Sequence, residues 1–282
     1  MNEHELEPAI RRILVALDAS LHSLAALEAA SELAESLKAE LVGIYVEDIN
    51  LLHLAGLPFA REVSYLSLAL RPLDSPSMER ELRLQAERAR QVLAGVARRR
   101  QLRWSFRVVR GQVSTELLTA AQEADMLAIG RASGATTRRV RLGGTAREVL
   151  AQVARSVLLL QHGHTICHPV QLVYDGSTAA KRALATAARV ASLAGGHLSV
   201  MIVTGAADQA QRLQEETEAD LQARQIQGHY RQLVNPTAEE LAQALHQAGG
   251  GTLIIGADNP LLGGEGLPTL LEAIDCSVLL IH

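Results

Sequence analysis

ILVALDAS (13–20) is a run of apolar residues that ends in an aspartate, and an Ala-rich helical pattern and a second apolar run, LVGIYVED (41–48), follow it. The same order returns in QLVYDGST (171–178), which leads through another Ala-rich pattern to HLSVMIV (197–203). Strand, aspartate, helix and strand therefore occur twice in the same register, which is the signature of an internal repeat.

The repeat continues to the end of each half. GQVSTELLTAAQEADMLAIG (111–130) matches NPTAEELAQALHQAGGGTLIIG (235–256), and the closing strands are ARSVLLLQH (154–162) and DCSVLLIH (275–282). Apolar runs that do not alternate, each preceded by a helical pattern, indicate parallel strands with helices on both faces. Five such runs occur per half, so the sequence predicts an α/β protein of two doubly wound, five-stranded parallel-sheet domains in tandem, of Rossmann-like type.

The domain boundary is expected in HGHTICHP (162–169), which carries turn residues and lacks periodicity. This divides the chain into residues 1–163 and 164–282. We further expect the two domains to pack about a pseudo-two-fold axis with SVLLLQ (156–161) near SVLLI (277–281), because pairing these strands removes two exposed apolar edges at once. The chain would then be a covalent pseudo-dimer, either monomeric or a homodimer of pseudo-dimers.

The first half is longer than the second, which predicts an insertion over about residues 47–102. Its first part, 50–73, is rich in Leu and contains Phe59, and a charged helix is expected over 77–100. The apolar part either packs on its own domain, which we favour, or covers a crevice or meets a protein partner.

Composition excludes several classes of function. A net charge of −4 and 2% aromatic residues provide neither a positive field nor stacking rings for nucleic acid. No apolar run reaches the length of a membrane span, and two cysteines are too few for a disulfide framework. A cytoplasmic location is the simplest expectation.

The stretch that carries chemistry is GRASGATTRRVRLGGT (130–145), a glycine-rich loop between an apolar strand and a helix. Glycines let backbone amides approach phosphate oxygens, and a helix N-terminus adds free N–H groups with a partial positive charge. The arginines within the loop could balance the charge of a triphosphate, and the last residue adds a hydroxyl: Arg138, Arg139, Arg141 and Thr145. The alternative is a solvated basic loop.

This loop resembles the motif of the ATP-binding universal stress proteins, which is Gly, two residues, Gly, nine residues, Gly and Ser or Thr. Gly134, Gly144 and Thr145 keep the nine-residue gap, whereas three residues separate Gly130 from Gly134. The family's aspartate after the first strand matches Asp18, beside Ala16, and its small aliphatic contact to adenine matches Val46. The resemblance covers nearly the whole chain.

The resemblance implies a stress-response regulatory protein that binds ATP or a related adenine nucleotide, with or without Mg²⁺, in its first domain, and that meets an unidentified protein partner. Two alternatives remain: a scaffold that has lost nucleotide binding, and a slow ATPase. We expect at most weak ATP hydrolysis, because the familiar P-loop, GxSxG and HExxH signatures are absent from the sequence.

Two further interpretations stay open at this level. Asp18 and its counterpart Asp175 both precede helices, so helix capping explains their repetition about as well as ligand binding does. The second half has no family motif, places Glu265 near the position of Gly144 and has no Arg or Lys after Gly256, so we expect it not to bind nucleotide.

Histidines and a cysteine cluster in the expected linker, but their spacing matches no zinc pattern, and we expect no metal site: His162, His164, Cys167 and His168.

Overall fold

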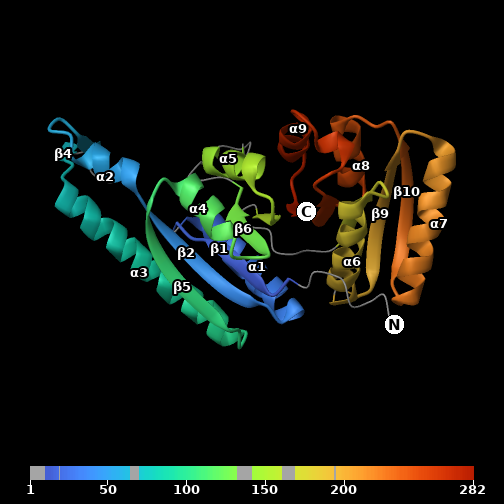
Figure 1. Ribbon diagram of the computed structural model, residues 1–282, viewed down its shortest axis with the longest axis horizontal. Coiled ribbons are helices and arrows are strands. Elements are labelled where there is room, and N and C mark those ends of the chain that lie inside the picture. Colours follow the sequence, from blue (N-terminus) through green and yellow to red (C-terminus); the bar gives the residue numbers. More distant parts are fainter. Residues whose placement is uncertain (1–9, 19, 64–69, 132–141, 161–168, 194) are drawn as a thin grey trace.

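The computed structural model of the protein describes residues 10–18, 20–63, 70–131, 142–160, 169–193 and 195–282. Its centre is one ten-stranded sheet to which both halves of the chain contribute (Figure 1). The strand order is β10-β9-β8-β11-β12-β7-β6-β1-β2-β5. The expected linker, 162–169, lies outside the described residues except for Pro169.

The first half supplies one block of five parallel strands, β1 (Arg12–Ala16), β2 (Glu40–Asp48), β5 (Trp104–Gly111), β6 (Met126–Gly130) and β7 (Ser156–Leu160). The second half supplies the other, β8 (Val170–Tyr174), β9 (His197–Thr204), β10 (Gln227–Val234), β11 (Thr252–Gly256) and β12 (Ser277–Ile281). Numbered within its half, each block has the order 3-2-1-4-5. The predicted pair of five-stranded parallel sets is confirmed.

Helices cover both faces of the sheet. One face carries α1 (Leu21–Leu37), α3 (Ser75–Arg99), α6 (Thr178–Leu193) and α7 (Ala207–Ala223). The other carries α4 (Val113–Ala121), α5 (Gly144–Gln152), α8 (Ala238–Gln247) and α9 (Gly266–Ala273), the last preceded by the short 3-10 helix η2 (Pro260–Leu262). Each layer of helices buries a separate apolar core against the sheet, as a parallel sheet requires.

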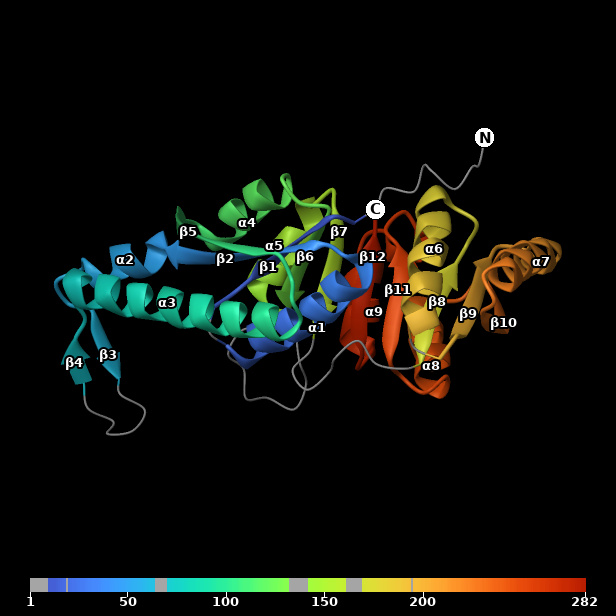
Figure 2. The same ribbon diagram turned by 90° about the horizontal axis from the view of Figure 1, so that it is seen from below.

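The two halves meet where β7 pairs with β12, and this is the antiparallel step of the sheet (Figure 2). Leu158 lies opposite Leu279 in the register, and both side chains are buried. The predicted proximity of the two closing strands is thereby confirmed. Pairing them leaves β5 and β10 as the edges of the sheet.

The predicted insertion is too long, because the charged helix is part of the regular fold. α3 connects β2 to β5 as α7 connects β9 to β10, and two parallel strands always need such a crossover. The addition is therefore the segment between β2 and α3, which forms α2 (Ile49–Ala55) and a small hairpin of β3 (Arg61–Val63) and β4 (Leu70–Pro72). This segment lies at one end of the molecule (Figure 1).

The expectation that the apolar part of this segment packs on its own domain is wrong for four of its large side chains. Of the residues of α2, only Ala55 is buried. Four large apolar side chains are exposed: Leu51, Leu54, Leu57 and Phe59. They belong to the segment around α2, which extends beyond the end of the large sheet (Figure 2).

Cys276, just before β12, offers a test of the packing between the halves. It is 5% exposed, and burial raises the pKa of its thiol to about 11, against a smaller opposing effect of Arg131. Because the thiolate is the reactive species, we expect iodoacetamide at pH 8 to leave Cys276 unmodified in the folded protein and to alkylate it in urea. Mass spectrometry of the peptide that contains Cys276 separates it from Cys167, and rapid labelling without urea would contradict the packing.

No helix of the described residues combines the length and the apolarity needed to cross a membrane.

Candidate functional site

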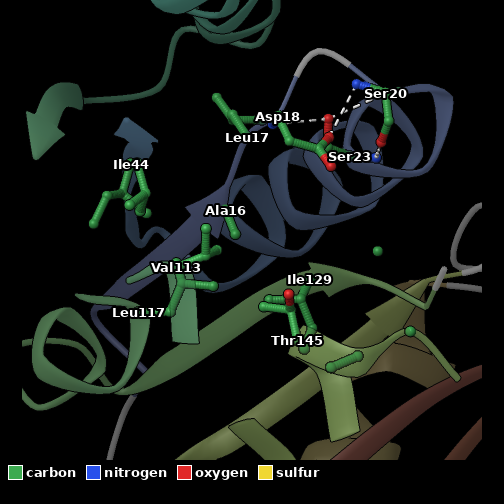
Figure 3. Close-up of a pocket in the computed structure, with 14 residues that line it drawn as sticks. Ala16, Leu17, Asp18, Ser20, Ser23, Ile44, Val113, Leu117, Ile129 and Thr145 are labelled. Carbon is green, nitrogen blue, oxygen red and sulfur yellow. Dashed lines mark hydrogen bonds between the residues drawn. The ribbon is translucent and has the colours of Figure 1, made fainter. Parts of the chain in front are cut away.

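A pocket lies in the first half at the point where the strand order reverses, between β1 and β6. Ligands of open α/β sheets bind at such a point, beyond the carboxyl ends of the strands. The pocket is lined from the ends of β1, β2 and β6 and from the first turns of α1, α4 and α5: Ala16, Leu17, Asp18, Ser20, Ser23, Ile44, Val46, Val113, Leu117, Ile129, Gly130, Gly143, Thr145 and Ala146 (Figure 3).

Five of the predicted binding residues meet at this pocket: Ala16, Asp18, Val46, Gly130 and Thr145. Gly144 begins α5 directly beside two lining residues but does not itself line the pocket. The other predicted residues lie outside the described part of the chain: Gly134, Arg138, Arg139 and Arg141. Their placement around a ligand stays a prediction.

The structure adds an apolar wall that the sequence analysis missed. Ile44, Val113 and Leu117 face the space between β2, α4 and β6 (Figure 3). The i, i+4 spacing of Val113 and Leu117 at the start of a helix was the available signal, but it also fits an ordinary core-facing stripe. The enclosed space is about 120 Å³, smaller than the roughly 300–1,000 Å³ of typical ligand pockets, so the described walls would enclose only part of a larger ligand.

Asp18 is not the N-cap of α1. Ser20 is the cap, because its side chain accepts a hydrogen bond from Ser23 N at 3.1 Å. Asp18 Oδ1 in turn accepts one from Ser20 N at 2.9 Å and so fixes the turn before the helix. The aspartate is exposed at the pocket, and Oδ2 accepts no hydrogen bond from any other described residue. One of its oxygens is therefore structural, and the other has no hydrogen-bond partner among the described residues.

The N-terminus of α5 has no side chain that caps it, because its N-cap is Gly143. The first amides of a helix lack partners within the helix, and they carry the positive end of its dipole. Gly143 and Thr145, both at this end, line the pocket. No Lys or Arg is among the described lining residues, so the favourable field for an anion comes there from backbone amides.

The second half repeats the turn before its first helix, α6, but there a second carboxylate, that of Asp258, binds at the start of the helix. Asp175 Oδ1 accepts a hydrogen bond from Ser177 N at 2.9 Å, as Asp18 does from Ser20. Asp258 then accepts bonds from Ser177 Oγ at 2.8 Å and from Ala179 N at 3.3 Å, at the start of α6. Asp258 lies two residues after Gly256, which matches Gly130. A fixed negative charge at this place would repel phosphate.

Glu265 precedes α9 directly as Gly143 precedes α5, so the predicted carboxylate near the position of Gly144 is one residue away from it. The loss of nucleotide binding in the second half stays a prediction that rests on both Glu265 and Asp258.

Gly130 has a packing role that the glycine motif did not suggest. A Cβ at this position would lie 2.8 Å from His22 Cβ and 3.0 Å from the His22 backbone carbon, so the start of α1 needs the glycine. At Gly256 a Cβ would lie 2.8 Å from Ala180 N in α6. The repeated glycine is explained by close helix packing in both halves, whether or not a ligand binds.

Gly256→Ala should therefore destabilise the protein by about 1–3 kcal/mol, the usual range for overpacking a tight contact. A Cβ at Gly144 meets nothing within 4 Å, so Gly144→Ala is the matched control and should not destabilise. Urea unfolding followed by circular dichroism measures both. Equal unfolding midpoints for Gly256→Ala and the wild type would contradict the close approach.

No group of three or more His, Cys, Asp or Glu side chains within the described residues is arranged to hold a metal ion. The histidine cluster of the linker, from His162 to His168, lies outside that part of the chain.

Residues 9–161 match the family described as Universal stress protein family. Among solved structures, a universal stress protein from Archaeoglobus fulgidus aligns at a TM-score of 0.73 and 17% identity, covering 96% of this chain and 95% of that one. A putative universal stress protein from Pseudomonas aeruginosa aligns at 0.64 and 15% identity, covering 97% and 93%. No curated protein matches the chain. The structural matches show the fold over almost the whole length.

Proposed function

Because this chain belongs to the universal stress protein family, we propose that its first half binds ATP or a related adenine nucleotide and that occupancy regulates how the protein meets a partner under stress. The observation that carries the proposal is the pocket at the β1–β6 switch point, which combines an apolar wall with an uncapped helix N-terminus.

The chemistry of the lining residues suggests which end of the pocket would hold the base and which the phosphates. Val46, Ile44 and Leu117 provide an apolar surface for a planar base. The free oxygen of Asp18 can accept from the exocyclic amine of adenine or from a ribose hydroxyl. The amides at the start of α5, with the Thr145 hydroxyl, suit the phosphates. Mg²⁺ would be carried in by the phosphates, since the described lining offers it only one carboxylate.

The proposal assigns binding rather than turnover. Asp18 is the one titratable side chain among the described lining residues, and one of its oxygens is held by Ser20 N. A general base and a second group that stabilises the leaving phosphate would both be needed for fast hydrolysis. Phosphate release that disappears in Asp18→Ala would instead establish a slow ATPase.

A thermal-shift experiment tests the proposal. ATP at roughly 100 times its dissociation constant should stabilise the folded state by about 2.7 kcal/mol, which corresponds to several degrees in Tm. The protein is first shown by mass spectrometry after denaturation to be free of copurified nucleotide, and the scan is run with and without Mg²⁺. No shift at millimolar ATP under either condition would refute nucleotide binding.

The second candidate is a scaffold that meets a protein partner without nucleotide. The exposed side chains of the α2 segment favour it, since Leu51, Leu54 and Phe59 remain 40%, 48% and 76% exposed. A partner-capture experiment with Leu54→Ser and Phe59→Ser, performed with nucleotide-free protein, distinguishes this function from the first.

A further inference from the structure

The phosphate end of the proposed site is tied to the second half of the chain through Arg131, the residue after Gly130. The backbone of Arg131 holds the base of the pocket, because its N–H donates to Leu160 O at 2.7 Å and its carbonyl accepts from Gly143 N at 2.9 Å. Two residues beside Arg131 line the pocket: Gly130, which precedes it in the sequence, and Gly143, which donates to its carbonyl. The position of Arg131 therefore sets the distance between the end of β6 and the start of α5.

The side chain of Arg131 points away from the pocket and into the contact between the halves. It is 2% exposed, and Nη1 donates to Ile274 O at 2.8 Å, across 143 residues of sequence. Ile274 is the C-cap of α9, so its carbonyl lies at the negative end of that helix. Burial lowers the pKa of Arg131, while Cys276, Asp275 and Glu272 oppose this effect.

A second contact also reaches α9 from the first half, this time from α5 and on the surface. Arg147 in α5 forms an ion pair with Glu272 in α9 at 3.6 Å. Both side chains are exposed, so this pair alone contributes little. It nevertheless places the helix whose N-terminus faces the pocket beside the helix that accepts the Arg131 bond.

The second half has the backbone contact without the side chain. Ala257 N donates to Ile281 O at 2.8 Å, as Arg131 N does to Leu160 O, and Ala257 follows Gly256 as Arg131 follows Gly130. An alanine cannot reach across. The link is thus asymmetric within the described residues. Arg131 of the first half, which has the pocket, reaches the second half. The second half, in which Asp258 binds the start of α6, has an alanine at the matching position.

We propose that Arg131 is a positioning residue for the nucleotide site and that the second half acts through it to hold the phosphate end of the pocket. This inference rests on the proposed function. Because coupling free energy is reciprocal, a nucleotide that binds better when Arg131 is anchored must also stabilise the α9 end that anchors it.

The test uses the full chain and ATP measured by titration calorimetry. Arg131→Met removes the donor and should weaken ATP binding about tenfold or more, whereas Arg131→Lys, which keeps a donor and the charge, should restore part of the loss. Arg155→Met is the matched control: Arg155 also donates to a backbone carbonyl, Gln122 O at 3.1 Å, but within the first half and away from the pocket, and binding should stay unchanged.

Hydrogen exchange of residues 272–276 is a second measurement. If Arg131 had a purely structural role, ATP would not change the exchange rate of these residues. ATP should slow exchange there in the wild type and should not do so in Arg131→Met at an ATP concentration that saturates this variant. If the variant does not fold, the wild-type exchange decides the matter alone, since no slowing would overturn the proposal. If folded Arg131→Met binds ATP as tightly as the wild type does, the positioning role of Arg131 is overturned and the proposed function stands. If the wild type binds no ATP, the proposed function and the positioning role are both overturned.

Discussion

Gly144→Asp is expected to weaken ATP binding at least 100-fold while leaving the unliganded protein as stable as the wild type or slightly more so. Gly144 is the first residue of α5, and a Cβ there meets no atom within 4 Å, so the side chain has room. An aspartate in the first turn of a helix stabilises it by about 0.3–1 kcal/mol through the helix dipole. The same carboxylate would lie where phosphate oxygens approach, and two charges about 4 Å apart at an effective dielectric constant near 20 repel by about 4 kcal/mol.

Gly144→Ala is the control, because it adds the Cβ without the charge and should bind ATP nearly as the wild type does. Titration calorimetry measures the affinities, and thermal unfolding without ligand measures the stabilities. Tight ATP binding by Gly144→Asp would place the phosphates away from α5 and contradict the proposed orientation. A lower Tm in both variants would instead show that the start of α5 needs glycine for its own structure.

Leu158→Ala is expected to lower the free energy of unfolding by about 2–5 kcal/mol, the range for truncating a fully buried leucine. Leu158 is 0% exposed in β7 and lies opposite Leu279 of β12, at the centre of the sheet. Because folded domains have only about 5–15 kcal/mol of stability, this is a large part of the total. Leu54→Ala makes the same chemical change at a 48% exposed position and should stay within about 0.5 kcal/mol.

The double variant Leu158→Ala with Leu279→Ala tests whether the two halves share one core. Side chains in contact show coupling energies of about 0.5–3 kcal/mol, so the two losses should not be additive. Urea unfolding followed by circular dichroism gives all the free energies. Strictly additive losses, or two separate transitions of which Leu158→Ala moves only one, would mean that the halves fold independently.

The repeat and the strands could be predicted from the sequence because their signals are local. A continuous apolar run such as VLLL (157–160) identifies a buried parallel strand by itself, and two copies of one pattern imply two copies of one fold. The pairing of β7 with β12 also followed, since an apolar strand at the end of each copy needs a partner. In the same way, Asp18 and Gly130 could be placed at one crevice because parallel strands end at one edge.

The sequence does not show where the insertion ends, because α3 is rich in charged residues and does not resemble the Ala-rich helices of the repeat. Its pattern therefore does not identify it as a crossover helix. Its inner face nevertheless buries small and aliphatic residues such as Ala89, Leu93 and Val96 beneath the charges. The sequence also cannot decide whether Asp18 caps α1. Capping depends on which oxygen reaches which amide, and Ser20 makes that bond.

The architecture, the duplication and the location of the crevice follow from the amino-acid sequence, since each depends on periodicity, on repetition or on the rule that parallel strands end together. The tertiary structure alone decided that Asp258 occupies the start of α6, that Gly130 is needed by His22, and that Arg131 reaches Ile274. These are contacts between residues 79 to 143 positions apart, as with Ala179 and Asp258 or Arg131 and Ile274. Their partners are chosen by how helices pack on a finished sheet, and no local pattern in the chain encodes that choice.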